Sequence, residues 1–253
     1  MTYQVDPYRG LNGAVALVAG ASRGIGRGIA LELAERGARV VGTSRDGDQA
    51  HELARLLGTP LCVLDVTDPM SVQQAIGTIT ETLGPVRALV NNAGVNVPAP
   101  FLDVAVKDWD RILTTNARGP FLTSQAVART LHAHRLGGAI VFVGSQAGLV
   151  GIEERAAYCA SKAALLGLTR VMAIELAAFD ITANCVAPTF VETELTRSTL
   201  ARPDMRDRFL SRVPAQRFAR VEDVVGAVSF LLSEQSRMIT GQALAVDGGW
   251  TTW

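Results

Sequence analysis

Short hydrophobic runs recur along the chain, and most of them do not alternate with polar residues. Runs of this kind are typical of strands that are buried on both faces of a parallel sheet. The pattern predicts about seven strands, at Ala14–Ala19, Arg39–Ser44, Pro60–Leu64, Ala88–Asn91, Ala139–Gly144, Ile181–Ala187 and Ala243–Val246.

Longer segments with helical character separate these runs. An alternation of strand and helix is the pattern of a doubly wound sheet. We therefore predict an α/β protein with one domain, residues 1–253, in which a Rossmann-type parallel sheet carries helices on both faces. The predicted helices are Ile25–Arg36, Gln49–Leu57, Ser71–Leu83, Lys107–His134, Arg155–Phe179 and Val221–Ser233.

Residues 190–218 interrupt this alternation and are rich in Thr, Arg and Pro. We expect this segment to form a helical lid over a binding site.

The composition agrees with a folded globular protein and argues against several other classes. Hydrophobic residues make up 48% of the 253 residues and charged residues 19%, which is enough to fill a sizeable core. Lys plus Arg (24) balance Asp plus Glu (24), so nothing in the charge favours nucleic acid or an anionic membrane as a partner.

The chain has no visible signal for export or membrane insertion. No basic start is followed by an apolar run, and no stretch reaches 18 consecutive apolar residues. Cys62, Cys159 and Cys185 are widely spaced, which suggests reduced thiols and a cytoplasmic protein. His132 and His134 point in different directions on a helix and have no cluster of ligands beside them, so we predict no metal site.

The glycine-rich loop Gly20-Ala21-Ser22-Arg23-Gly24-Ile25-Gly26 follows the first predicted strand and opens the first helix. Its first five residues match G-x-S-x-G, the nucleophile elbow of a serine hydrolase. Its glycines also permit a tight turn against a dinucleotide's phosphates, at a helix N-terminus that favours anions. A hydrolase triad of this kind needs a histidine late in the chain, and the last histidine is His134. We therefore favour dinucleotide binding over the hydrolase and over a plain strand–helix turn.

Further motifs follow the glycine loop in a fixed order. They are NNAG (Asn91–Gly94), Asn116 in TTNARG, Ser145 in VGSQAG, Tyr158 and Lys162 in YCASK, and TGQALAVDGGW (Thr240–Trp250). Together with the glycine loop, these motifs resemble those of the short-chain dehydrogenase/reductase family, over essentially Leu11 to Trp253, in the branch of 3-oxoacyl-thioester reductases and gluconate-type dehydrogenases.

The resemblance implies an oxidoreductase that interconverts a ketone and a secondary alcohol by hydride transfer. Tyr158 is then the acid that protonates the carbonyl oxygen, and it takes the alcohol proton in the reverse direction. Lys162, one helical turn away, would lower the pKa of that tyrosine from its usual value near 10. Ser145 would orient the substrate oxygen, and Asn116 would hold a water that links Lys162 to solvent.

The resemblance also implies a nicotinamide cofactor, and the residues after the second strand favour NADP(H) over NAD(H). Relatives that use NAD have a carboxylate where this chain has Ser44, which Arg45 follows. Ser44, Arg45 and Arg23 could bind a 2′-phosphate. Asp46 leaves NAD open as the alternative, because it lies near the spacing expected for a ribose-binding acid.

Other cofactor contacts carry over by motif. Asp65 and Val66 would bracket the adenine, Asn92, Ala93 and Gly94 would line the cofactor, and Pro188 and Thr193 would flank the carboxamide. The chain departs from the family at Ala19, which is often Thr, and at Thr189, which is often Gly.

The substrate is expected to be a small ketone or alcohol, with no nucleic-acid or membrane partner. A β-ketoacyl thioester, a sugar acid or polyol, and a general ketone all stay open as substrates. A non-catalytic regulator that binds the cofactor is the alternative outside enzymes. Family members are commonly tetramers, and small residues on the helix of Tyr158 fit either a subunit interface or packing on the chain's own sheet, so we predict a homotetramer.

Overall fold

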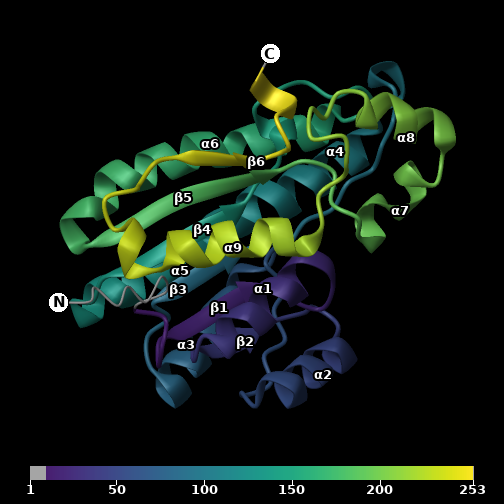
Figure 1. The fold of residues 1–253 in the computed structure, drawn as a ribbon. Helices are drawn as coiled ribbons and strands as arrows, with labels where there is room; N and C mark the ends of the chain where they lie inside the picture. The colour runs from purple at the N-terminus through teal and green to yellow at the C-terminus, as the bar shows by residue number, and fades with distance from the viewer. Residues whose placement is uncertain (1–9, 253) are drawn as a thin grey trace.

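The computed structural model describes residues 10–252 of the chain. Its strands form one sheet, and every pair of neighbouring strands is parallel (Figure 1). The order across the sheet is β2-β1-β3-β4-β5-β6. The strands are β1 (Val15–Ala19), β2 (Arg39–Gly42), β3 (Ala88–Asn91), β4 (Gly138–Val143), β5 (Ile181–Pro188) and β6 (Ala243–Val246).

Helices cover both faces of this sheet, as the strand–helix alternation predicts. Helices α1 (Gly24–Glu35) and α9 (Val221–Leu232) pack on one face, where Ile29 and Val228 are fully buried. Helices α3 (Pro69–Leu83), α5 (Gly119–His134) and α6 (Ala156–Leu176) pack on the other face. The remaining helices of the described chain with at least two turns are α2 (Gly47–Leu57), α4 (Val106–Leu113), α7 (Glu194–Leu200) and α8 (Pro203–Leu210).

The sheet has six strands rather than the expected seven. Residues 60–64 lie beyond β2 at the edge of the sheet, and only one bridge, between Ser44 and Val63, joins them to the neighbouring segment. Leu61 and Val63 are exposed by 45% and 47%. A strand at this edge would have an unpaired outer side, and β2 already ends at Gly42, so a ladder does not form.

The long helix expected over residues 107–134 is divided into α4 and α5. A π-helical turn, η2 (Thr114–Arg118), lies between them. Pro120 has no N–H, so the carbonyl oxygen of Asn116 lacks its α-helical donor four residues on. The wider turn accommodates this break and is a common feature of functional sites.

The expected lid region contains α7 and α8, which project beyond the carboxyl ends of β5 and β6 (Figure 1). The strand order reverses between β1 and β3, and open α/β sheets bind their ligands at that point. Within the described chain, no helix combines the length and the apolar character needed to cross a membrane.

Candidate active site

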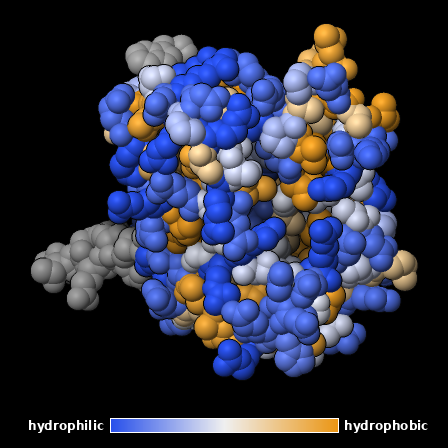
Figure 2. All heavy atoms as spheres, turned by 90° about the vertical axis from the view of Figure 1, so that its right-hand side faces the viewer, coloured by the Kyte–Doolittle hydropathy of each residue, from blue (hydrophilic) through white to orange (hydrophobic). Residues whose placement is uncertain are grey.

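A cleft of about 410 Å³ opens at the carboxyl ends of the strands. Figure 2 shows this side of the molecule, where a hollow lies among mostly hydrophilic residues with some hydrophobic ones at its border. The cleft is lined by nearly all the cofactor and catalytic residues expected from the sequence: Gly20, Ser22, Arg23, Gly24, Ile25, Ser44, Arg45, Asp65, Val66, Asn92, Ala93, Gly94, Ser145, Tyr158, Lys162, Pro188 and Thr193.

The glycine loop forms the floor of the cleft between β1 and α1. Gly20 has φ +77°, and a side chain there would come within 2.8 Å of the Ala93 backbone. Gly26 is needed for a different reason from the one expected, because it packs inside the loop and does not line the cleft. A Cβ at Gly26 would lie 2.2 Å from the Gly20 carbonyl oxygen and 2.4 Å from Nδ2 of Asn92.

The family often has a threonine at the position of Ala19. In this chain, which has alanine there, two hydrogen bonds from other residues hold the glycine loop. The Asn92 side chain donates to the Gly20 carbonyl at 2.7 Å, and the Gly20 N–H donates to the Thr43 hydroxyl at 3.4 Å. Asn92 and Thr43 therefore support the turn.

The end of β2 presents the residues that bear on cofactor choice. Ser44 is buried, and its hydroxyl donates to Oε1 of Gln49 and accepts from the Asp46 N–H. The Asp46 carboxylate accepts from the Gln49 N–H at 3.0 Å, so it caps the N-terminus of α2. Arg45 is exposed at the edge of the cleft.

Arg23 forms an ion pair that the sequence did not indicate. Its guanidinium lies 2.9 Å from the carboxylate of Glu194, which begins α7. The two residues are 171 positions apart, so no local pattern could have connected them. Glu194 also lines the cleft, and the pair joins the glycine loop to the lid region.

The adenine and nicotinamide regions predicted by motif lie in the same cleft. Asp65 accepts two hydrogen bonds from Thr67, which lower the pKa of its carboxyl. Thr189 stands where the family often has glycine. Its hydroxyl is buried and has no hydrogen-bond partner, and the residue lines the cleft.

The structure brings Ser145, Tyr158 and Lys162 together at the other end of the cleft. Ser145 follows β4 and lines the cleft together with Tyr158, and its hydroxyl accepts from the Ala147 N–H at 3.1 Å. Tyr158 and Lys162 share one face of α6, and the Lys162 ammonium lies 5.6 Å from the centroid of the tyrosine ring. The ammonium donates to the Val143 carbonyl at 2.8 Å.

Burial dominates the acidity of these groups. It raises the pKa of Tyr158 above its usual value, while the hydrogen bond with Ser145 and the charge of Arg155 oppose that rise. Burial also lowers the pKa of Lys162 to about 8. The lowering of the Tyr158 pKa expected from the sequence counted the charge of an oxidised nicotinamide as well as that of Lys162; in the protein alone, desolvation of the phenolate outweighs the nearby charges.

Asn116 lies behind the catalytic set, on η2, and is fully buried. Its side chain is saturated locally: Oδ1 accepts from the Val95 N–H, and Nδ2 donates to the Val95 carbonyl and the Ser161 hydroxyl. These bonds tie the π-helical turn to Val95 and Ser161, while Pro120 leaves the backbone carbonyl of Asn116 without an α-helical donor.

Comparisons with known proteins identify the family. The model of the enoyl-(acyl carrier protein) reductase family matches residues 20–251. The chain is 40% identical over 239 residues to the 3-oxoacyl-[acyl-carrier-protein] reductase FabG of Escherichia coli, covering 94% of this chain and 97% of that protein. The chain belongs to the short-chain dehydrogenase/reductase family. It is also 42% identical over 241 residues to human L-xylulose reductase, with 94% and 97% covered.

A solved structure with high similarity is a gluconate 5-dehydrogenase from Burkholderia cenocepacia in complex with NADP and tartrate. Its TM-score is 0.94 at 36% identity, with 98% of each chain covered. Membership in the short-chain dehydrogenase/reductase family makes this protein an oxidoreductase that acts on alcohol and ketone groups. The hydrolase interpretation of Ser22 is thereby excluded.

Proposed function

We propose that the protein is an NADP(H)-dependent oxidoreductase that interconverts a small ketone and a secondary alcohol, with Tyr158 as the acid and base. The observation that carries this proposal is one continuous cleft, lined by the glycine loop and by Ser145, Tyr158 and Lys162. Bare backbone at the loop suits a pyrophosphate, and a bound nicotinamide supplies or accepts the hydride.

The protein's own groups would handle the proton. The Ser145 hydroxyl orients the substrate oxygen, and the Tyr158 hydroxyl donates its proton to that oxygen during reduction. Lys162 is buried and close to the tyrosine ring, so its charge and that of an oxidised nicotinamide favour the phenolate. The Asn116 carbonyl, which lacks its helical donor, is suited to hold a water that returns protons through Lys162.

The preference for NADP(H) rests on two arginines at the cleft. Arg23 and Arg45 line it, and although Asp46 lines it too, its carboxylate is engaged as a helix cap. The solved gluconate 5-dehydrogenase relative was crystallised with NADP, which supports the same choice. A 2′-phosphate would compete with Glu194 for Arg23.

The test is a titration of the purified protein with NADPH and NADH side by side, followed by nicotinamide fluorescence. At least tenfold tighter binding of NADPH, or at least about 1.4 kcal/mol, is expected. Equal or tighter binding of NADH would favour the alternative, an NAD-dependent sugar-acid or polyol dehydrogenase.

We also propose a homotetramer built partly through α6. Ala163, Ala164 and Gly167 are exposed, and Val171 and Ile174 continue the same stripe at 51% and 80% exposure. These small and apolar residues do not pack on the chain's own sheet, so a second copy is the natural cover. A monomer mass in light scattering would contradict this assembly.

A non-catalytic regulator on the same fold is the remaining alternative. A protein that only binds the cofactor has no use for a buried lysine beside a tyrosine and serine pair. Free thiols at Cys62, Cys159 and Cys185 suit the cytoplasm, which we propose as the location.

A further inference from the structure

Thr189 carries a buried hydroxyl that the protein leaves without a partner. The residue comes directly after β5, is 8% exposed and lines the cleft. Its hydroxyl oxygen has no hydrogen-bond partner among the residues that the structure describes. A buried hydroxyl of this kind gives up its hydrogen bonds to water and gains none in return, which is unfavourable for folding.

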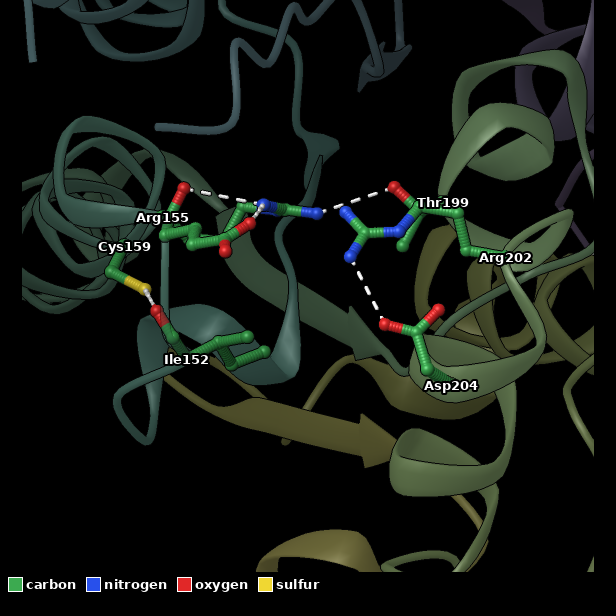
Figure 3. A network of polar contacts seen from close by, with 7 residues as sticks. Ile152, Arg155, Cys159, Thr199, Arg202 and Asp204 are labelled. Atoms are coloured by element: carbon green, nitrogen blue, oxygen red, sulfur yellow. Dashed lines mark hydrogen bonds and ion pairs between the residues drawn. The ribbon is translucent and has the colours of Figure 1, made fainter. Parts of the chain in front are cut away.

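Polar side chains elsewhere around the lid do find partners within the protein. In Figure 3, the Arg155 guanidinium donates to the Thr199 hydroxyl on α7 at 3.3 Å. Arg202 donates to the carboxylate of Asp204 on α8 at 3.0 Å. The family often has glycine at the position of Thr189, so the fold does not need a hydroxyl there. The open hydroxyl is therefore a feature of the cleft and not of the lid in general.

The backbone on both sides of Thr189 is held by hydrogen bonds. The Thr189 N–H donates to the Val246 carbonyl at 3.1 Å and extends the pairing of β5 with β6 by one residue. Next to it, the Ala219 N–H donates to the Phe190 carbonyl at 3.0 Å, and the Glu192 N–H donates to the Ala219 carbonyl at 3.1 Å. Because a threonine is also stiff at χ1, the hydroxyl has a fixed place in the cleft before a ligand arrives.

The segment that carries Thr189 runs along the cleft from the catalytic end to the glycine loop. On one side, Val186 of β5 pairs with Val143, whose carbonyl accepts from the ammonium of the catalytic lysine. On the other side, a Cβ at Gly24 would lie 3.3 Å from the side chain of Thr193. Thr189 lies between these two ends.

A nicotinamide would occupy this middle stretch of the cleft. The glycine loop suits the pyrophosphate, and hydride transfer requires the ring to lie against a substrate carbon whose oxygen is at Ser145 and Tyr158. The polar substituent of the ring is a carboxamide, which has a carbonyl acceptor and an amide donor. A hydroxyl can donate and accept, so Thr189 matches a carboxamide in either orientation.

We propose that the Thr189 hydroxyl binds the carboxamide of the nicotinamide. This hydrogen bond adds to the contacts that the family resemblance implies for Pro188 and Thr193. The carboxamide is attached directly to the ring, so a bond to it limits the rotation of the ring and helps to orient the face that carries the hydride. The inference rests on the proposed function, because it needs a nicotinamide cofactor in this cleft.

The first experiment separates the nicotinamide from the rest of the cofactor. NADP⁺ and 2′,5′-ADP, which has the 2′-phosphate and no nicotinamide, are titrated by calorimetry against the wild type and Thr189→Val. We expect NADP⁺ to bind about 3- to 10-fold more weakly to the variant, as for the loss of one neutral hydrogen bond, and 2′,5′-ADP to bind equally to both. Equal binding of NADP⁺ to both proteins, or the same loss for both ligands, would overturn the assignment.

The second experiment tests whether the hydroxyl is free in the protein alone. Valine would lower the melting temperature if the hydroxyl had a partner in the protein. We expect Thr189→Val without cofactor to melt at or above the temperature of the wild type, because a methyl group replaces an unpaired buried hydroxyl. A clearly lower melting temperature would overturn the assignment.

Two further variants complete this comparison. Thr189→Ser keeps the hydroxyl and should keep most of the NADP⁺ affinity, and an affinity as low as that of Thr189→Val would assign the effect to the methyl group and overturn the proposal. Thr78→Val, an exposed change on α3, is the matched control and should alter neither NADP⁺ binding nor the melting temperature.

The two proposals fail in different ways. If ketones are reduced with NADPH and Thr189→Val binds NADP⁺ as tightly as the wild type, the Thr189 assignment falls and the oxidoreductase stands. A change confined to the KM of the ketone would place the hydroxyl on the substrate and has the same consequence. If no ketone or alcohol in a broad panel turns over, while Thr189→Val weakens NADP⁺ alone, the proposed reaction falls and the cofactor contact stands. No binding of NADP⁺ to the wild type would overturn both.

Discussion

The buried ammonium of Lys162 makes the stability of the protein depend on pH in a defined way. Lys162 is 4% exposed, and burial lowers its pKa from 10.5 to about 8. In the unfolded chain the lysine recovers its ordinary pKa. Between about pH 8 and 10.5 the unfolded state therefore binds a proton that the folded state does not.

The difference in proton binding sets both the direction and the size of the change in the free energy of unfolding with pH. Where the unfolded state binds more protons, the free energy of unfolding rises with pH, by about 1.4 kcal/mol per pH unit for one proton. A pKa lowered from 10.5 to about 8 corresponds to about 3 kcal/mol in total. That stability is fully present above pH 10.5 and is lost as the pH falls toward 8.

Lys162→Met removes the titration and keeps most of the volume. The variant also leaves the Val143 carbonyl without its donor, which costs a constant amount at every pH. The difference between wild type and variant therefore isolates the lysine. We expect the difference in the free energy of unfolding between wild type and variant to be constant below about pH 7.5. Between pH 8 and 10.5 this difference should shift in favour of the wild type by up to about 3 kcal/mol.

The assay is urea unfolding at several pH values and one fixed protein concentration. The chain has two lysines, so Lys107→Met, an exposed change, is a matched control that should show no such trend. A wild-type-minus-variant difference that stays constant from pH 7 to 10 would refute the claim that Lys162 titrates with a lowered pKa.

Three further predictions concern the loop, the lid and the assembly. Gly26→Ala should abolish NADPH binding or folding, because its Cβ would lie 2.2 Å from the Gly20 carbonyl oxygen. Gly47→Ala, whose Cβ would have no atom within 4 Å, should change neither. Fluorescence titration with NADPH and melting curves test both variants. Glu194→Gln should tighten NADPH binding severalfold by releasing Arg23, and unchanged affinity would show that this ion pair does not compete with the phosphate. Gly167→Arg should reduce the mass in light scattering from tetramer to a smaller species, and an unchanged mass would exclude α6 from the interface.

Much of the fold could be predicted because most of its strands, β1, β3, β4 and β5 among them, are buried on both faces. β3 and β6 have the predicted bounds, β1 and β5 differ from theirs by one residue at one end, and β4 is shifted by one residue at both ends. The segment at residues 60–64 has the same apolar character, yet it lies at an open edge, and hydrophobicity alone does not tell an edge from a centre.

The part of the site that belongs to short sequence motifs could be predicted. The glycine loop, Ser145, Tyr158 and Lys162 each lie next to a recognisable strand end or helix start, and the structure brings them together in one cleft. The link between Arg23 and Glu194 could not be predicted, since it depends on how the lid folds back over the loop.

The charge of Arg155 shows a second limit of sequence reasoning. The sequence predicts a helix that begins at Arg155 and does not show that this arginine is buried, as the structure has it at 5% exposure. The same limit applies to the acidity of Tyr158, because the burial that raises its pKa comes from elements distant in the chain.

The most direct test of the account is turnover by Tyr158→Phe at saturating NADPH. The change removes only the hydroxyl of a tyrosine that lines the cleft together with Ser145. We expect reduction of ketones to be lost while NADPH affinity, measured by fluorescence, stays close to that of the wild type. Activity within about threefold of the wild type, less than about 1 kcal/mol in the barrier, would contradict the role of Tyr158 as the acid.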